Sequence, residues 1–487
     1  MDILLIDPPY VSLKGRSIER GYTVGLTSLA AYLRNADIET AVLMGDLLMD
    51  SRSGLIATLL PGVGTNQDAN KYAAGQLQYQ KIIDDKDHIV WKRLTDIVNQ
   101  TKPGAVGISY MTPSKHVVER VAGLIRAIDR DIKIIVGSFH PTFCPEEVMQ
   151  NPDIDFIVGG EGEIPLLGLV KELKKNSPKW ETVPGIYYRD SDGQVRNNPG
   201  VDLISNLDEL PFLARDLVLN CDYAQYRLHG ISTARGCPYT CSFCSERRLW
   251  GGKVRRRSVN NVIKELKLLD NAYKVNYVDI VDGTFTFDRK YLQEFCNAII
   301  NEKLKIKWRC LARYDNLDEG LLKLMKQANC SGMYFGLESG SNRMLKYIDK
   351  KITVDKIIEV SKMVYDSGIA SATSILIGLP EENKKDMEET LELMKKVKTD
   401  IFDVNNYSPL PGTTLYDAMS EEDRNNIDWR KVAFKSFDNH FSKNISNDDF
   451  TRYRSEAYKI ADNVRIKTIF RLGAKRFFHH IVKIFKS

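Results

Sequence analysis

Short apolar runs alternate with stretches of helical periodicity from the N-terminus to about residue 200. Continuous apolar runs bounded by turn residues predict buried parallel strands. Strands that alternate with helices predict an open, doubly wound α/β sheet, which binds its ligands beyond the carboxyl ends of the strands. We expect strands at residues 3–6, 40–43, 104–109, 132–136 and 155–160, and helices at 25–34, 117–128, 145–150 and 164–174.

Two segments of this region depart from the alternation. Residues 51–100 are mixed polar and helical in character, and we interpret them as an insertion beside the sheet. Residues 176–215 predict a β-ribbon and a linker, because the turn pair Asp192-Gly193 follows a strand-like run.

A second series of strands and helices runs from about residue 216 to residue 420. Six consecutive βα units predict a partial or full parallel barrel, in which reactive groups line the carboxyl ends of the strands. The expected strands are 231–234, 276–281, 307–310, 332–336, 371–377 and 403–405, and the expected helices are 260–269, 289–300, 317–327, 354–367 and 386–397.

Candidate site residues follow several of these strands. Asp282 ends the second strand and Arg313 follows the third. Glu338 and Ser339 end the fourth strand, and Gly378 ends the fifth. One carboxylate at a strand end is a weak signal, because such positions are often simply exposed. The joint placement of all five at one end of the predicted barrel favours a binding site there.

Size and composition limit the class of protein. A chain of 487 residues exceeds one typical domain, and we expect three parts: 1–200, 216–420 and a helical region, 421–487. Hydrophobic content of 43% and charged content of 27% are those of a globular protein. A net charge of +5 is too small to indicate nucleic-acid binding by itself. The chain shows neither a signal peptide nor an apolar run long enough for a transmembrane helix, so we expect a cytoplasmic protein that binds no nucleic acid.

Three of the eight cysteines lie close together after the first strand of the second series. Cys237, Cys241 and Cys244 have the spacing C-x-x-x-C-x-x-C. Three thiolates on one loop can hold three irons of a cubane cluster and leave the fourth iron without a protein ligand. A structural zinc site normally has four protein ligands, and the nearest other candidates are His229 and Cys296. A zinc knuckle, or thiols that merely pack, is the structural alternative.

The other five cysteines stand singly along the chain. Their scattered positions do not resemble a disulfide framework, which fits a reducing cytoplasm. These cysteines are Cys144, Cys221, Cys296, Cys310 and Cys330.

The cysteine loop resembles that of radical S-adenosylmethionine (SAM) enzymes. The lead-in R-G-C-P-Y-x-C and the aromatic Phe243 just before the last cysteine are typical of that family. The resemblance implies that the open iron of a [4Fe–4S] cluster binds SAM, and that the reduced cluster cleaves it to a 5′-deoxyadenosyl radical. It also implies an external electron donor such as flavodoxin or ferredoxin. By the same resemblance, SAM is surrounded by Asp282, Arg313, Glu338, Ser339 and Gly378.

The first α/β region is similar to the cobalamin-binding domain that precedes the radical domain in one large subfamily. The motifs D-P-P near the start, G-x-H-P-T around His140 and V-G-G-E-G-E are typical of it. The resemblance implies that Gly159, Gly160 and Glu161 contact cobalamin. The chain lacks the D-x-H-x-x-G motif whose histidine ligates cobalt in many cobalamin proteins, and we interpret His140 as a turn or core residue. A degenerate domain that no longer binds cobalamin is the alternative.

The C-terminal region predicts helices. We expect residues 426–465 to cover the barrel mouth. Residues 465–486 contain seven basic and no acidic residues, with Ile466, Phe470, Phe477, Ile481 and Ile484 at helical spacing. A basic amphipathic helix can lie on an anionic membrane, although we favour a terminal helix docked on the protein. Membrane contact through 465–487 would favour a lipid-like substrate and a location at the inner face of the membrane.

The resemblance implies methyl transfer to an unactivated carbon. One SAM would methylate cob(I)alamin, a second would give the deoxyadenosyl radical, and a small-molecule or lipid-like substrate radical would take the methyl group. The alternative within the family is cyclisation, rearrangement or dehydration without methylation. The alternative from another class is a non-catalytic metal-binding scaffold.

Overall fold

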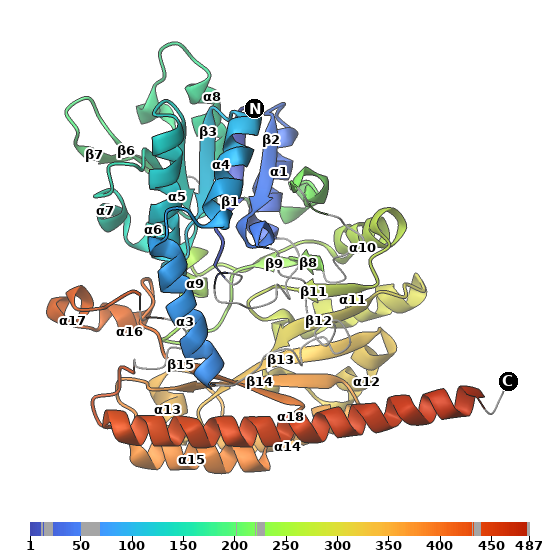
Figure 1. The fold of residues 1–487 in the computed structure, drawn as a ribbon. Helices are drawn as coiled ribbons and strands as arrows, with labels where there is room; N and C mark the ends of the chain where they lie inside the picture. Colours follow the sequence, from blue (N-terminus) through green and yellow to red (C-terminus); the bar gives the residue numbers. More distant parts are fainter. Residues whose placement is uncertain are drawn as a thin grey trace. The chain divides into compact units, whose positions relative to one another are not determined.

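Figure 1 shows the computed structural model, which describes residues 1–10, 13, 23–49, 69–200, 202–219, 221, 229–430, 432 and 440–484. The chain forms two compact units. The first comprises Met1–Ser53, Ala74–Gly283 and Pro409–Val432, and the second comprises Gly54–Ala73, Thr284–Ser408 and Ala433–Ser487.

The first unit is built on a seven-stranded sheet with the order β2-β1-β3-β4-β5-β6-β7. Strands β1 to β5 are parallel, and the strand order reverses between β1 and β3, which is the switch point of a doubly wound sheet. The hairpin β6–β7 adds two antiparallel strands to the edge. The strands are β1 (Ile3–Asp7), β2 (Thr40–Met44), β3 (Ala105–Ser109), β4 (Lys133–Gly137), β5 (Phe156–Val158), β6 (Ile186–Arg189) and β7 (Val195–Asn197).

Helices cover both faces of this sheet. Alternate residues of β1 enter two different cores: Leu4 and Ile6 join one cluster, and Ile3 and Leu5 join the other. The first cluster includes residues of α4 (Ile89–Thr101) and α5 (Lys115–Ile128). The second includes residues of α1 (Val24–Arg34) and α8 (Glu163–Leu173). Both faces of β1 are therefore buried, which explains its continuous apolar run.

Three further helices belong to this region. Helix α3 (Ala69–Asp84) lies in the predicted insertion, of which residues 50–68 fall outside the described residues. The expected helix at 145–150 is present as the shorter α7 (Pro145–Val148), and another short helix, α6 (Phe139–Phe143), precedes it.

The second series begins within the first unit. Strand β8 (His229–Ile231) pairs in parallel with β11 (Tyr277–Ile280), and helix α10 (Val259–Tyr273) connects them. The expected strand at 231–234 is wrong in detail, because the chain leaves β8 after Ile231. Residues 234–235 instead form β9 (Ala234–Arg235), which pairs antiparallel with β10 (Arg255–Arg256).

The second unit carries four parallel strands in chain order, with β13 beside β12 and β14, and β14 beside β15. Helices connect the strands, as the βα pattern predicts. The strands are β12 (Lys307–Ala312), β13 (Cys330–Glu338), β14 (Ala370–Ile377) and β15 (Ile401–Asn406). The helices are α11 (Arg289–Asn301), α12 (Glu319–Gln327), α13 (Asn342–Tyr347), α14 (Val354–Ser367) and α15 (Lys384–Lys396).

A long C-terminal helix, α18 (Asn447–Ile484), packs along β15 and α15. Thr468 donates a hydrogen bond of 3.0 Å to the Asp400 carbonyl at the start of β15. The expectation of helices over the barrel mouth is therefore wrong for α18, which runs beside the last strand. Before α18, the backbone N–H groups of Phe441 and Lys443 donate hydrogen bonds to the carbonyls of Gly378 and Pro380 in the loop after β14.

Candidate active site

The three cysteines lie on an irregular loop between β9 and α9 (Glu246–Leu249), and none is in a disulfide. Gly236 precedes the first of them with φ +95°, and a Cβ at this position would overlap the Lys253 carbonyl oxygen. Only glycine fits such a backbone. At the other end of the loop, the Cys244 N–H donates to the Cys241 carbonyl at 3.1 Å, which forms a tight turn.

The three thiols share one environment without converging on a single ion position. The Glu246 N–H donates a hydrogen bond to the Cys244 sulfur, and the charges of Glu246, Cys241 and Cys237 act on the same atom. Among the residues that the structure describes, no group of three ligand atoms within 4.8 Å of one another includes these thiols. Thiolates about 2.3 Å from a tetrahedral zinc ion lie roughly 3.8 Å apart. In a cubane each thiolate binds a different iron, so the three sulfurs need not lie as close together as in a zinc site.

Asp282 holds the residues that lead into this loop. Its Oδ1 accepts hydrogen bonds from the Thr233 N–H at 2.7 Å and the Ala234 N–H at 3.0 Å, and Oδ2 accepts from the Thr233 hydroxyl. Burial raises the pKa of Asp282, although these hydrogen bonds oppose the shift. The predicted site residue Asp282 is therefore a buried clamp between the end of β11 and the approach to Cys237.

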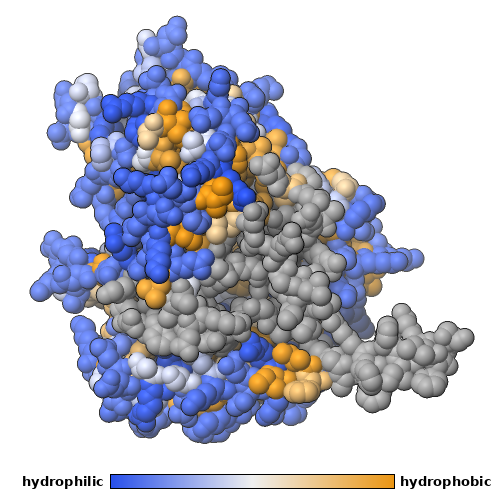
Figure 2. All heavy atoms as spheres, viewed as in Figure 1, coloured by the Kyte–Doolittle hydropathy of each residue, from blue (hydrophilic) through white to orange (hydrophobic). Residues whose placement is uncertain are grey.

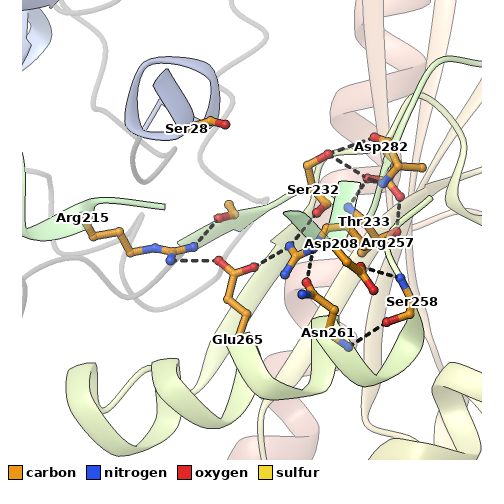
Figure 3. A network of polar contacts seen from close by, with 12 residues as sticks. Ser28, Asp208, Arg215, Ser232, Thr233, Arg257, Ser258, Asn261, Glu265 and Asp282 are labelled. Atoms are coloured by element: carbon orange, nitrogen blue, oxygen red, sulfur yellow. Dashed lines mark hydrogen bonds and ion pairs between the residues drawn. The ribbon is translucent and has the colours of Figure 1, made fainter. Parts of the chain in front are cut away.

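A second buried network supports the same segment (Figure 3). Arg215 and Glu265 are both fully buried and form an ion pair of 3.0 Å. Arg215 also donates to the Gly230 carbonyl at 2.9 Å, and Arg257 donates to Glu265 at 2.6 Å and to the Ser232 carbonyl at 2.9 Å. Charges buried without such partners would be strongly destabilising. The network fixes β8 relative to α10.

Ion pairs join the Gly-rich turn after β5 to the β9–β10 hairpin. Glu161 accepts hydrogen bonds from Arg235 and, at 2.9 Å, from Arg255. Glu163 pairs with Arg235 at 2.5 Å. Burial of Glu161 opposes ionisation, but hydrogen bonds from Arg255 and Arg235 outweigh it and lower the pKa of its carboxyl group. The sequence predicts that Glu161 contacts cobalamin. In the structure its carboxylate binds two arginines beside the cysteine loop.

The glycines of the turn leave room for a ligand at the carboxyl end of β5. Gly160 has φ +65°, and a Cβ there would meet nothing within 4 Å. The Gly160 N–H donates to the Thr142 hydroxyl at 3.1 Å, and the Gly159 N–H donates to the Gly185 carbonyl at 3.1 Å. A doubly wound domain binds its ligands beyond the carboxyl ends of its strands, where this turn lies. These residues fit a cobalamin bound there.

His140 is buried in the first unit and stacks on Tyr110, with ring centroids 4.8 Å apart. Burial lowers the pKa of His140 to about 4. The imidazole is therefore neutral in the folded protein.

In the second unit, Glu338 is held in an unusual conformation by a residue that sequence reasoning missed. Glu338 has φ +69° at a register shift in β13, and its Oε1 accepts a hydrogen bond of 2.9 Å from the buried Lys350. A Cβ on Gly336 would overlap both Glu338 and Lys350. Left-handed backbone at a glutamate costs free energy, so the surrounding contacts must hold it. Lys350 lies in a polar run that carries no recognisable pattern.

Arg313 and Ser339 are also buried in this unit. Arg313 donates to the Asp315 carboxylate at 2.9 and 2.8 Å and to the Lys350 carbonyl at 2.6 Å. The Ser339 hydroxyl lies 3.2 Å from the Thr390 hydroxyl. Lys350 therefore links Arg313 to Glu338, and these three residues form one connected group.

The loop after β14 depends on a second residue that the sequence interpretation missed. Gly378 has φ +83°, and its N–H donates to Glu382 at 2.5 Å. Glu382 is fully buried, and burial raises its pKa to about 8. The nearby sequence G-L-P-E-E is the available signal, since the carboxylate two residues after the proline of such a turn can accept backbone N–H groups.

Family models match two parts of the chain. The B12 binding domain matches residues 71–170, and the Radical SAM superfamily matches residues 231–394. The uncharacterized methyltransferase PH0819 of Pyrococcus horikoshii is 33% identical over 361 residues, which cover 72% of this chain and 78% of that protein. An anaerobic magnesium-protoporphyrin IX monomethyl ester cyclase of Rubrivivax gelatinosus is 28% identical, covering 67% of this chain and 60% of that protein.

The fold has a solved counterpart. The structure of the radical SAM methyltransferase TsrM from Kitasatospora setae, with cobalamin and a [4Fe-4S] cluster bound, aligns with a TM-score of 0.64 at 16% identity. The alignment covers 87% of this chain and 78% of that chain. The predicted α/β fold, with an N-terminal parallel sheet and a radical SAM domain, is confirmed. The predicted cofactors, a [4Fe–4S] cluster, SAM and cobalamin, are confirmed at the level of these two families. The chain belongs to the radical SAM superfamily, as an enzyme that carries a B12-binding domain before its radical SAM domain.

Proposed function

We propose that the protein is a cobalamin-dependent radical SAM methyltransferase that acts on an unactivated carbon. When bound, the cluster supplies the electron that cleaves SAM, and cobalamin serves as the methyl carrier. The most similar of the relatives described above is named a methyltransferase, and so is the solved structure. The cyclase relative supports the alternative, a cobalamin-binding enzyme that does not methylate.

One observation carries the proposal: Glu161, in the Gly-rich turn after β5 that we assign to cobalamin, binds the β9–β10 strand pair beside the cysteine loop. Its arginine partners, Arg235 and Arg255, lie at the two strands of that hairpin. Arg235 is two residues before Cys237. Two cofactors that act on one substrate carbon must be held at a fixed separation, because small misplacements cost large factors in rate. Buried, charge-assisted arginine–carboxylate hydrogen bonds supply such rigidity.

We assign SAM binding to the connected group in the second unit. Glu338 has one oxygen bonded to Lys350, and within the described residues its Oε2 is left to accept hydrogen bonds from the ribose or amino group of SAM. Arg313 contributes positive charge for the SAM carboxylate. Ser339 and the backbone of Gly378 are the remaining residues that we assign to SAM binding. Gly159 and Gly160 are assigned to cobalamin, and Asp282 and Glu161 to positioning of the cysteine loop.

We propose a small-molecule substrate and an external electron donor such as flavodoxin or ferredoxin. We also propose a functional division into a cobalamin-binding part (1–200), a radical SAM part (216–420) and a C-terminal part (421–487).

For the C-terminal tail we propose docking on the protein rather than on membrane. Arg471 pairs with Asp400, beside the hydrogen bond from Thr468. Ile466, Ile469 and Phe470 are nevertheless exposed, and Figure 2 shows apolar surface on this part of α18. Side chains beyond residue 471 lie outside the described residues. No helix that the structure describes combines the length and the apolar character needed to cross a bilayer. Co-sedimentation with anionic liposomes that is lost on deleting residues 465–487 would overturn the docking proposal.

The decisive experiment needs no substrate. The anaerobically reconstituted enzyme, loaded with cobalamin and reduced, is given SAM with a deuterated methyl group. We expect S-adenosylhomocysteine and the labelled methyl group on the bound cobalamin, both detected by mass spectrometry. Formation of 5′-deoxyadenosine with neither of these products would contradict methyl transfer and favour the non-methylating alternative.

A further inference from the structure

A second group of metal-ligating side chains lies in the first unit, away from the cysteine loop in the sequence. His140 is on α6, Cys144 follows α6, and Glu147 is on α7, just beyond the carboxyl end of β4. The imidazole nitrogen, the sulfur and a carboxylate oxygen all lie within 4.8 Å of one another. Nothing in the proposed function uses these three side chains together.

The imidazole of His140 points an unused nitrogen into this group. Within the part of the chain that the structure describes, the buried Nε2 atom has no hydrogen-bond partner. It lies 3.9 Å from Glu147 Oε2. The other nitrogen, Nδ1, lies 3.2 Å from the Thr112 hydroxyl. A histidine that donates its second ring N–H to such a group presents a lone pair on the first nitrogen, which is the usual arrangement of a metal ligand.

The two other side chains of the group each have a further polar partner. Cys144 is half-buried, and its sulfur forms a hydrogen bond with the Tyr416 hydroxyl. Glu147 uses Oε1 to pair with Lys115 at 2.6 Å, while Oε2 faces the imidazole. Lys115 also pairs with Glu119 at 3.1 Å, so its positive charge is shared between two carboxylates. One carboxylate and one thiolate would balance the charge of a divalent cation.

We propose that His140, Cys144 and Glu147 bind one zinc ion, with a water molecule as the fourth ligand. Nitrogen, sulfur and oxygen donors in a tetrahedral set suit zinc better than magnesium or calcium, which prefer oxygen alone. Bonds of about 2.0–2.3 Å would draw the three atoms closer than they are without the ion. Binding releases the thiol proton and links α6 to α7 beside β4.

The test uses the full chain with Cys237, Cys241 and Cys244 replaced by alanine, so that the cluster loop cannot take up zinc. After chelator treatment, the protein is titrated with zinc in competition with a chromophoric chelator, and with Co²⁺ as a spectroscopic probe. We expect one equivalent of tightly bound zinc, and a thiolate-to-cobalt charge-transfer band with Co²⁺. Cys144→Ser and Glu147→Gln should each weaken zinc binding about 100-fold or more, since even changes outside the ligand set cost roughly 10–100-fold.

Two matched controls come from the same unit. Cys221→Ser removes another half-buried cysteine, and Glu146→Gln removes the exposed neighbour of Glu147. Both should bind zinc as the parent does, and circular dichroism should show that every variant is folded. Glu147→Gln tests the proposal even if the cysteine variant does not fold, because Glu147 is partly exposed. No zinc equivalent in the parent, or equal affinity in all four variants, would overturn the proposal.

Discussion

Asp282 accepts the Thr233 N–H at 2.7 Å and also the Thr233 hydroxyl, so one buried carboxylate at the end of β11 holds the strand that leads into the cysteine loop. The carboxylate is better placed to shape this loop than to contact a ligand directly. It connects two βα units through backbone groups that would otherwise be buried without partners.

Replacing Asp282 by alanine should destabilise the cluster. The change leaves two backbone N–H groups unsatisfied, each at a cost of about 1–3 kcal/mol. We expect Asp282→Ala to lose most of its iron and sulfide after anaerobic reconstitution, measured per chain. Thr233→Val, which removes only the hydroxyl donor, should lose much less. Full iron content in Asp282→Ala would contradict the positioning role.

The Glu161–Arg235 pair should show strong energetic coupling. A double-mutant cycle with Glu161→Gln and Arg235→Gln, measured by denaturant unfolding, should give a coupling free energy above about 1.5 kcal/mol because both charges are largely buried. The matched control is the pair Arg34–Asp216, whose side chains are 43% and 51% exposed. Exposed pairs contribute about 0–1 kcal/mol. Equal coupling in both cycles would show that the buried pair does not fix the hairpin.

Gly336 should be essential for SAM binding. A methyl group at this position would overlap Glu338 and Lys350, so Gly336→Ala should separate that ion pair. We expect at least a tenfold weaker affinity for SAM by equilibrium binding, with near-normal cluster content. Gly320→Ala, in α12 of the same unit, should bind SAM normally because the added carbon meets only Asp318 at 3.4 Å. Normal SAM affinity in Gly336→Ala would refute the assignment of Glu338.

Glu382 should make stability depend on pH. Its pKa is about 8 in the folded protein and 4.5 for the ordinary carboxyl group. Between these values the unfolded chain has lost the proton that the folded chain keeps, so the contribution of Glu382 to stability falls as pH rises through this window. Glu382→Gln retains an acceptor for the Gly378 N–H without the titration. The Tm of the variant minus that of the parent should therefore increase from pH 5 to pH 8. A difference independent of pH would contradict the shifted pKa.

Apolar runs between turn residues are enough to predict β1 to β5, because both faces of these strands are buried. The cysteine spacing predicted the cluster loop for a similar reason, since its chemistry is local. The polar contacts that complete the site were not predictable. Lys350 and Glu338 are 12 residues apart in the sequence, and Arg215 and Glu265 are 50 residues apart. Neither pairing follows from the periodic pattern of apolar residues. The sequence does not predict that β8 ends at Ile231, because the strand pair β9–β10 joins Arg235 to Arg255, 20 residues apart in the chain.

The central claim is that Cys237, Cys241 and Cys244 hold a [4Fe–4S] cluster with one iron open to SAM. The most direct test is electron paramagnetic resonance of the anaerobically reconstituted and reduced enzyme, recorded with and without SAM. We predict a cubane signal that SAM shifts, and that disappears when any of the three cysteines is replaced by alanine. A protein that shows no cubane signal, or a signal that SAM leaves unchanged, would contradict the account.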